Sequence, residues 1–412
     1  MQFITRTLED TALKASRSFP ALVITGPRRS GKTFLLSHLF PKARYLLLED
    51  PDLQARARSD PRGLLAGLRH PVVFDEIQNV PELFPYIRAL IDRAPRAMGR
   101  WLFTGSQEAP LMQGVTESMA GRAAILQLLP FSLAETDRAT LLHGGYPEVL
   151  ARPADRELWF SSYIQTYLER DVRAVTNVRD LATFRRFLAL VASRHGQILN
   201  RTGLAAPLGV SVPTIIEWLH VLEITGQIML VPPYFNNFGK RLIKSPKVYI
   251  GDSGLACYLL GISSQAELDR SPFLGPLFEG FIAAEIHKSQ ISRGRRKELY
   301  YFRDQQALEV DFLFPDAHGA LHLVECKASR TVQPSMAVPM QRLKASIKDP
   351  TPVIMTVVHR PSKNALSTRA LTPEAEALDF ETFVSELNGS HKRAHPANRH
   401  GRIETGRAAT EA

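Results

Sequence analysis

A glycine-rich segment near the start of the chain has the composition and spacing of a phosphate-binding loop. Residues 26–33, GPRRSGKT, follow the apolar run ALVIT and precede a helix-like segment, as the G-x-x-x-x-G-K-[ST] pattern requires. In such a loop the backbone N–H groups surround the phosphates, the lysine reaches the β- and γ-phosphates, and the last hydroxyl binds Mg²⁺. We therefore expect ATP and Mg²⁺ as cofactors. The expected ligands are Gly26, Pro27, Arg28, Arg29, Ser30, Gly31, Lys32 and Thr33, with Thr33 also on the metal.

Two acids end the apolar segment PVVFDEIQN and complete the chemistry that this loop needs. Asp75 is placed to hold Mg²⁺, directly or through water, and Glu76 to orient and deprotonate the attacking water. The alternative is a pair of solvated acids at the end of a strand. Thr104 and Ser106 end a further strand-like run, RWLFTGS. One of these hydroxyls would contact the γ-phosphate or the lytic water, unless both only cap a helix.

Three arginines are candidates for neutralising the charge that develops during phosphoryl transfer. Arg122 follows a glycine in SMAGRAAILQL, and Arg170 and Arg173 lie in the segment YLERDVRAV. An arginine finger is often supplied by a neighbouring subunit, which would make the protein a homo-oligomer. The alternative for each of them is an ordinary surface ion pair.

A second set of residues with chemical potential lies about three hundred residues later, in the strand-like segments LEVDFLF and LHLVECKAS. Strand alternation places Glu325 and Lys327 on one face. Asp311 precedes Glu325 with thirteen residues between them, which is the spacing of the PD-(D/E)xK nuclease core. There two acids hold Mg²⁺ and the lysine positions or activates water. Glu279, favoured over Glu285, would add a third acid from the preceding helix; the alternative is a chance set of surface charges.

The segment NRTGLAAPLGVSVPTIIEWLHVLEI predicts a helix-turn-helix, followed by strands that would form a wing. Gly209 suits the turn, and Ser211 is a good N-cap for the second helix. That helix would expose Thr214 and Glu217, and because Glu217 would repel phosphate, protein packing is an alternative role. The better phosphate candidates are the basic residues around the wing, Lys240, Arg241, Lys244 and Lys247.

The elements that must position these residues indicate an α/β protein with several domains. Apolar strands alternate with amphipathic segments over residues 1–135, which predicts a parallel P-loop sheet covered by helices on both faces. A helical, winged-helix-like region is expected over 136–260, and a nuclease-like α/β domain over 271–385. Residues 391–412 carry five Lys/Arg against two Glu and few large apolar side chains, which predicts a disordered basic tail.

The composition narrows the cellular setting. The net charge of +10 over 412 residues favours contact with nucleic acid, with DNA ahead of RNA, or with another anionic surface. Only two cysteines occur, so no disulfide framework is implied, and a reducing cytoplasm is the simplest location. Because no apolar stretch is long enough to span a bilayer, we expect no membrane partner.

Motifs spread over most of the chain resemble a prokaryotic family, the AAA-type, archaeal-ATPase-like ATP-binding proteins whose C-terminal half is the domain of unknown function 4143. The resemblance rests on ITGPRRSGKT, VVFDEIQN, LFTGSQ, AGRAAILQLLPFS, GGYPEVL, YLERDV, YIGDSGLACYLLGI, LFEGFIAAEI, YYFRDQQALEVDFLF and VECKAS. It implies an N-terminal ATPase, a winged-helix-like region and a nuclease-like C-terminal domain. It also implies nucleotide roles for Lys32, Thr33, Asp75 and Glu76, and nuclease-core positions for Asp311, Glu325 and Lys327.

Three functions are compatible with these features. The first is an ATP-driven enzyme that acts on nucleic acid through a Mg²⁺ site in the C-terminal domain. The second is an ATP-gated regulatory switch, and the third is a protein-remodelling ATPase, each with a catalytically inactive nuclease-like fold.

Overall fold

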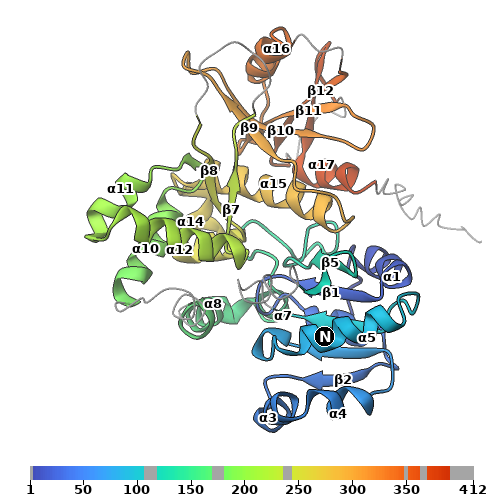
Figure 1. The fold of residues 1–412 in the computed structure, drawn as a ribbon. Coiled ribbons are helices and arrows are strands. Elements are labelled where there is room, and N and C mark those ends of the chain that lie inside the picture. Colours follow the sequence, from blue (N-terminus) through green and yellow to red (C-terminus); the bar gives the residue numbers. More distant parts are fainter. Residues whose placement is uncertain are drawn as a thin grey trace, which may run out of the picture.

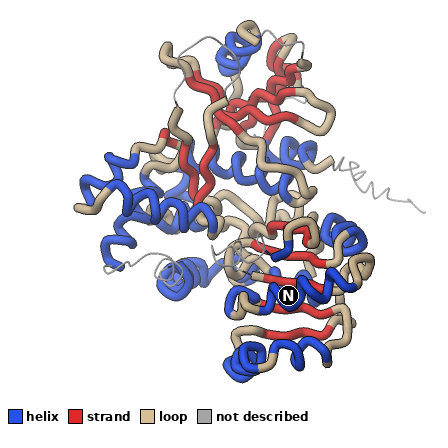
Figure 2. The backbone as a smooth tube through the Cα atoms, viewed as in Figure 1, coloured by secondary structure: helices blue, strands red, loops and turns tan. Residues whose placement is uncertain are grey.

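A computed structural model gives the arrangement of the chain (Figure 1). It describes residues 3–105, 118–168, 181–234, 244–347, 351–361 and 369–389. Within these ranges three separate sheets form, each with its own helices (Figure 2).

The first sheet contains five parallel strands in the order β2-β3-β4-β1-β5. The strands are β1 Ala21–Thr25, β2 Arg44–Leu47, β3 Val72–Asp75, β4 Trp101–Thr104 and β5 Ala123–Gln127. The helices are α1 Glu9–Ser18, α2 Lys32–Leu39, α3 Pro51–Ser59, α4 Pro61–Ala66, η1 Ile77–Asn79 and α5 Leu83–Arg93. The predicted parallel sheet is confirmed.

Both faces of this sheet are covered because the side chains of its central strand alternate. Leu22 and Ile24 of β1 pack with apolar residues of α1 and α2, whereas Val23 packs with those of α3, α4 and α5. Since all five strands run parallel, their carboxyl ends meet at one edge. The phosphate-binding loop, Asp75 and Thr104 therefore lie together at that edge.

A helical region follows and carries a small antiparallel sheet, β6-β8-β7. Its strands are β6 Gln197–Ile198, β7 Ile228–Val231 and β8 Lys247–Ile250. Its helices are α7 Pro147–Ala151, η2 Pro153–Asp155, α8 Arg156–Tyr163, η3 Ile164–Leu168, α10 Leu181–Ser193, α11 Arg201–Ala205, η4 Ala206–Leu208, α12 Val212–Ile224, α13 Ser253–Leu259 and α14 Gln265–Arg270.

The predicted helix-turn-helix forms from α11–η4 and α12. Gly209 adopts φ 66° in the turn, and the Ser211 hydroxyl accepts a hydrogen bond from the Thr214 N–H at 3.2 Å. Both features follow from local chemistry, since glycine tolerates positive φ and serine caps helices. The hairpin of β7 and β8 comes next in the chain.

The C-terminal sheet is mixed, in the order β13-β14-β12-β11-β10-β9. Its strands are β9 Tyr300–Arg303, β10 Glu309–Pro315, β11 Leu321–Lys327, β12 Val353–His359, β13 Ala370–Thr372 and β14 Ala375–Asp379. Its helices are α15 Leu274–Ile291, η5 Pro334–Ala337, α16 Val338–Lys344 and α17 Phe380–Leu387. The sequence predicted α15, β9, β10, β11, α16 and β12 but not the elements after them.

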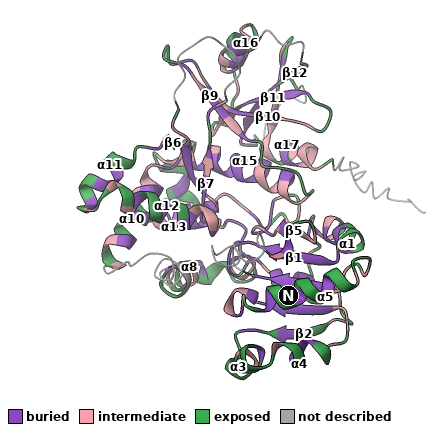
Figure 3. Cartoon of the chain, in the orientation of Figure 1, coloured by how far each residue is buried: buried purple, intermediate pink, exposed green. Residues whose placement is uncertain are grey.

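The small sheet of the middle region shares a core with the C-terminal domain. Met229 and Val231 of β7 and Tyr249 of β8 pack with apolar residues of α15, β10 and α17. Strands β1, β3, β4, β7 and β8 are largely buried, whereas the edge strand β2 and the outer sides of α3 and α12 are exposed (Figure 3). The middle and C-terminal regions are therefore joined by packing as well as by the chain.

No single helix in the described ranges is long and apolar enough to cross a membrane. One pair, Arg201–Leu208 with Val212–Ile224, passes that test together but is bent by 110° between its two parts.

Candidate functional site

The phosphate-binding loop connects β1 to α2 and is shaped by its two glycines. Gly26 has φ 139° and Gly31 has φ 98°, both in the region that favours glycine. A Cβ atom at Gly26 would lie 2.1 Å from the Leu128 carbonyl oxygen, so no other residue fits there. The Lys32 ammonium folds back over the loop and donates hydrogen bonds to the Gly26 and Pro27 carbonyls at 3.0 and 2.9 Å.

Asp75 is the centre of the polar contacts at the end of β3. It is buried, and its carboxylate accepts hydrogen bonds from the hydroxyls of Thr33, Tyr45 and Thr104. The Thr33 oxygen lies 3.0 and 3.1 Å from the two carboxylate oxygens. Burial, and then the Asp75 carboxylate, raise the pKa of Tyr45. This set of hard oxygens fits Mg²⁺, because Thr33 and Asp75 need little movement to share one ion.

Glu76 has an unusual backbone conformation. Its φ of 55° is in the left-handed region, which costs energy for a residue with a side chain and is found at functional sites. Its N–H donates to the Thr104 hydroxyl at 3.1 Å, and its carboxylate accepts a hydrogen bond from Gln78. The turn directs the Glu76 side chain into the same pocket as the loop.

The loop opens into a pocket of about 700 Å³ that is completed by segments outside the sheet. Phe3 and Ile4 come from the N-terminal segment, and Glu148 and Arg152 come from α7 and the residue after it. Burial raises the pKa of Glu148, whose carboxylate lies 3.6 Å from the guanidinium of Arg29. Arg28, Arg29, Ser30, Gly31, Lys32, Thr33, Asp75 and Glu76 all line this pocket.

The predicted arginine at position 122 does not reach the nucleotide pocket within one chain. The Arg122 guanidinium is paired with Asp92 at 2.6 Å on the surface, next to the start of β5. A surface ion pair was the alternative role for Arg122, and the structure contains that pair because Asp92 of α5 lies directly opposite the guanidinium. Ser106, Arg170, Arg173, Lys240, Arg241 and the tail 391–412 lie outside the described residues.

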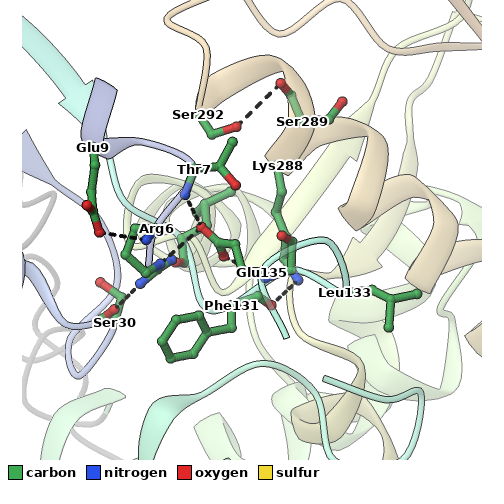
Figure 4. A network of polar contacts seen from close by, with 12 residues as sticks. Arg6, Thr7, Glu9, Ser30, Phe131, Leu133, Glu135, Lys288, Ser289 and Ser292 are labelled. Atoms are coloured by element: carbon green, nitrogen blue, oxygen red, sulfur yellow. Dashed lines mark hydrogen bonds and ion pairs between the residues drawn. The ribbon is translucent and has the colours of Figure 1, made fainter. Parts of the chain in front are cut away.

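A network centred on Arg6 fixes the loop to the segment that follows β5 (Figure 4). The Arg6 guanidinium donates to the carbonyls of Ser30 and Leu129 at 3.0 and 2.5 Å, and is paired with Glu135 at 3.1 Å. The ring of Phe131 lies 4.2 Å below the guanidinium. The loop backbone is therefore held by a buried cation from outside the sheet.

The segment after β5, residues 129–135, also forms hydrogen bonds with helix α15 of the C-terminal domain. The buried carboxylate of Glu285 accepts from the Leu133 N–H at 2.9 Å. The Lys288 ammonium donates to the Phe131 carbonyl and to Glu285, each at 2.9 Å (Figure 4). Residues 129–135 thus contact the phosphate-binding loop through Arg6 and the C-terminal domain through α15.

The C-terminal domain has a second pocket, of about 350 Å³, lined by Asp311 of β10 and by Glu325 and Lys327 of β11. The strands are adjacent and antiparallel, and the Cys326 N–H donates to Asp311 at 2.8 Å. The Lys327 ammonium lies 3.0 Å from the Glu325 carboxylate. Burial, and then the nearby Asp311, raise the pKa of Glu325 to about 9. The sequence prediction that these three side chains converge is confirmed.

Glu279 lies near this pocket but is held by other residues. Its Oε1 atom accepts from the Lys247 ammonium at 2.9 Å and from the Tyr249 hydroxyl at 2.5 Å. Burial, and then Asp311, raise the pKa of Glu279 to about 7. Within the described residues no group of three or more His, Cys, Asp or Glu side chains is arranged to hold a metal. Asp311 and Glu325 supply hard oxygens beside Lys327, whereas Glu309 of the same pocket is paired with Lys247. Two carboxylates fit a cation that keeps several waters.

The prediction that Lys247 contacts phosphate is wrong. Lys247 is buried, and its ammonium is paired with Glu279 at 2.9 Å and with Glu309 at 2.6 Å. Burial lowers the pKa of Lys247, but the carboxylates of Glu279, Asp311 and Glu309 outweigh it, so the pKa is raised. Lys244 is exposed, as a phosphate contact requires.

Three protein-family models match successive parts of the chain. Residues 18–136 match an AAA domain, 135–266 match the domain of unknown function DUF8612, and 274–372 match the domain of unknown function DUF4143. Uncharacterized protein Rv2008c of Mycobacterium tuberculosis is 34% identical over 381 residues, covering 87% of this chain and 84% of that protein. The same values hold for uncharacterized protein Mb2031c of Mycobacterium bovis. The chain belongs to the AAA-type ATPases with a DUF4143 domain.

Solved structures are similar at lower identity. The Walker-type ATPase PABY2304 of Pyrococcus abyssi is 17% identical, with 62% of this chain and 96% of that chain covered and a TM-score of 0.39. The RuvB Holliday junction branch migration motor of Thermotoga maritima is 17% identical, with 54% and 87% covered and a TM-score of 0.29.

Sequence reasoning missed several residues of both pockets of this AAA–DUF4143 protein. Arg6, Tyr45 and Glu148 belong to no short motif, and each reaches its site through a contact across many residues. Lys247 was noticed for its charge, but its burial was not predicted. The apolar residues that follow it in KVYI were the available signal, since a lysine at the start of a buried strand needs a partner.

Proposed function

We propose that this AAA–DUF4143 protein is a Mg²⁺-dependent ATPase whose nucleotide state acts on a nuclease-like, nucleic-acid-binding C-terminal domain. The observation that carries the proposal is the connection through residues 129–135. Arg6 links this segment to the Ser30 carbonyl of the phosphate-binding loop, and Glu285 and Lys288 link it to α15. Helix α15 also carries Glu279, which lies close enough to Asp311 for that carboxylate to help raise the pKa of Glu279.

In the ATPase pocket each residue has a separate role. The loop N–H groups and Lys32 bind the phosphates, and Thr33 and Asp75 hold Mg²⁺, which neutralises phosphate charge. Glu76 takes the proton of the attacking water, and Thr104 keeps Asp75 and the Glu76 backbone in place through its hydroxyl. An arginine from a neighbouring copy, Arg122 among the candidates, would complete the site in a homo-oligomer.

In the C-terminal pocket the chemistry would be phosphodiester hydrolysis. Asp311 and Glu325 would hold Mg²⁺, which polarises a phosphoryl oxygen when it is bound. Lys327 would orient the attacking water; its ammonium lies beside Glu325 and lines the same pocket, which supports this role. The helix-turn-helix with its β7–β8 hairpin, as a winged helix, and the net charge of +10 support DNA as the partner, in a cytoplasmic setting.

ATP hydrolysis measured with and without duplex DNA tests the proposal. Lys32→Ala should lose nucleotide binding, whereas Glu76→Gln should bind ATP normally and lose turnover. DNA should raise the wild-type rate. A DNA-independent rate together with no retention of DNA at low salt would reject the nucleic-acid half of the proposal.

A regulatory switch without cleavage is the second candidate. It is favoured by Glu279, whose carboxylate is engaged by Lys247 and Tyr249 rather than turned to the pocket. Incubation of DNA with the protein, Mg²⁺ and ATP, beside a Lys327→Ala control, separates the two candidates. Equal background nicking by both proteins would leave the switch.

A further inference from the structure

The Lys247 ammonium is enclosed by acids that belong to the C-terminal domain. Its side chain is 3% exposed, and it contacts Glu279 of α15 at 2.9 Å and Glu309 of β10 at 2.6 Å. Glu309 lies two residues before Asp311 on the same strand and lines the same pocket. The Lys247 ammonium therefore reaches this pocket through Glu309, although Lys247 is not itself among the residues that line the pocket.

Lys247 lies on β8 of the middle region, and aromatic residues restrict the position of its side chain and of β8. Tyr249, two residues further along β8, donates to Glu279 at 2.5 Å and has its ring 5.9 Å from that of Phe312. The ammonium also lies 5.5 Å from the centre of the Tyr301 ring. A buried charge with two ionic partners and an aromatic ring beside it has little freedom to move.

Basic side chains of the protein itself offset the acids around the pocket. Four carboxylates, those of Glu279, Glu309, Asp311 and Glu325, are accompanied by four basic side chains: Lys247, Lys327, Arg342, which lines the pocket, and Arg303, which lies 3.3 Å from Glu309. Without Lys247 two of the acids would lose their closest positive charge. A divalent cation competes for the same carboxylates, so Lys247 and the metal oppose each other.

We propose that Lys247 is a tethered cation of the C-terminal pocket, which withdraws Glu279 and Glu309 from any metal and leaves Asp311 and Glu325 as the metal's protein ligands. The proposal rests on the metal site proposed above. It makes the pocket a joint product of two regions, because the residue that sets its affinity for metal comes from β8 and its acids come from α15, β10 and β11.

Mn²⁺ binding to the full-length, nucleotide-free protein, measured from the electron paramagnetic resonance of the free ion, tests the proposal. Each variant is measured with and without Asp311→Asn. The difference in Mn²⁺ binding then reports the C-terminal pocket alone and excludes Mn²⁺ bound by Thr33 and Asp75 in the ATPase pocket. Lys247→Met, which removes the charge and keeps the length, should bind Mn²⁺ at least about tenfold more tightly at this pocket. Lys247→Arg should match the wild type to within about threefold.

The double variant Lys247→Met/Glu279→Gln is the matched control. It removes the same charge together with the acid that Lys247 occupies, so Mn²⁺ affinity should return to within about threefold of the wild type. Should Lys247→Met fail to fold, Lys247→Gln removes the charge while keeping a hydrogen bond to Glu279, and the same gain is expected.

The outcomes separate this proposal from the proposed function. Tight Mn²⁺ binding by the wild type with no gain in Lys247→Met overturns the role of Lys247 and leaves the metal site. Binding by Lys247→Met alone supports the role of Lys247 and argues against a metal enzyme in the wild type. No binding by either protein, or a gain that persists with Asp311→Asn, overturns the proposal.

Discussion

Gly280 of α15 packs against His195 and Tyr249 of the middle region, and its replacement by alanine should destabilise the protein. A Cβ atom there would be 2.0 Å from Nε2 and 2.7 Å from Cε1 of His195, and 3.1 Å from the Tyr249 ring. His195 is buried, and its Nδ1 accepts a hydrogen bond from the Ile250 N–H at 3.0 Å. The ring therefore cannot move aside without breaking a buried hydrogen bond.

The size of the effect follows from a matched position on the same helix. Gly275 also lies in α15, but a Cβ there meets nothing within 4 Å. Gly275→Ala should stabilise by about 0.5–1 kcal/mol, because alanine restricts the unfolded chain more than glycine. Gly280→Ala has the same gain but adds an overpacking cost of about 1–3 kcal/mol, more if the ring has to be expelled. The two variants should therefore differ by about 1–3 kcal/mol.

Urea unfolding followed by circular dichroism and tryptophan fluorescence measures this difference. The urea midpoints of the variants are compared, because the chain has more than one core and a single free energy of unfolding is not defined for it. His195→Asn provides the rescue. An asparagine Oδ1 keeps an acceptor for the Ile250 N–H and removes the atoms that a Cβ at Gly280 would strike. Gly280→Ala in the His195→Asn background should recover most of the loss. Equal midpoints for Gly280→Ala and Gly275→Ala would refute this account of the packing.

Three further results are expected. Because the pKa of Glu325 is raised from 4.5 to about 9, the folded protein keeps a proton that the unfolded chain releases. Without divalent cations the free energy of unfolding should thus fall as pH rises from about 5 to 9, and Glu325→Gln should flatten this slope. Glu285→Gln weakens the contacts to Leu133 and Lys288, so ATP should change hydrogen exchange in α15 less than in the wild type, at unchanged ATP affinity. Deleting 391–412, which carries five Lys/Arg, should lower DNA affinity and make its log–log dependence on salt shallower; an unchanged slope would contradict a role for these residues.

The parts that the sequence predicted well depend on local chemistry. The phosphate-binding loop, the acids at the end of β3 and the Ser211 cap each need only a few consecutive residues, and all form as expected. The convergence of Asp311 with Glu325 was predictable because strand alternation and one hairpin determine it. These features could be predicted from the sequence because no contact with a distant part of the chain changes them.

What failed depends on which elements meet in three dimensions. Lys247 has the composition of an exposed wing residue, yet α15 and β10 bring Glu279 and Glu309 against it, and burial follows. Arg122, one of three candidate arginine fingers, is paired within its own chain with Asp92 of α5, a contact between elements that the sequence did not indicate. Elements β13, β14 and α17 are short and come after a segment without strong periodicity, so no local pattern indicated them.

The position of the first described residues has a practical consequence for handling the protein. Phe3 and Ile4 line the nucleotide pocket, and Arg6 holds the loop backbone three residues later. An affinity tag or fluorescent fusion placed ahead of residue 3 would lie beside that pocket, where its bulk and charge would interfere with nucleotide binding. Assays of nucleotide binding are therefore best done with an untagged N-terminus, or with labels introduced at exposed sites such as Leu158, which is 71% exposed.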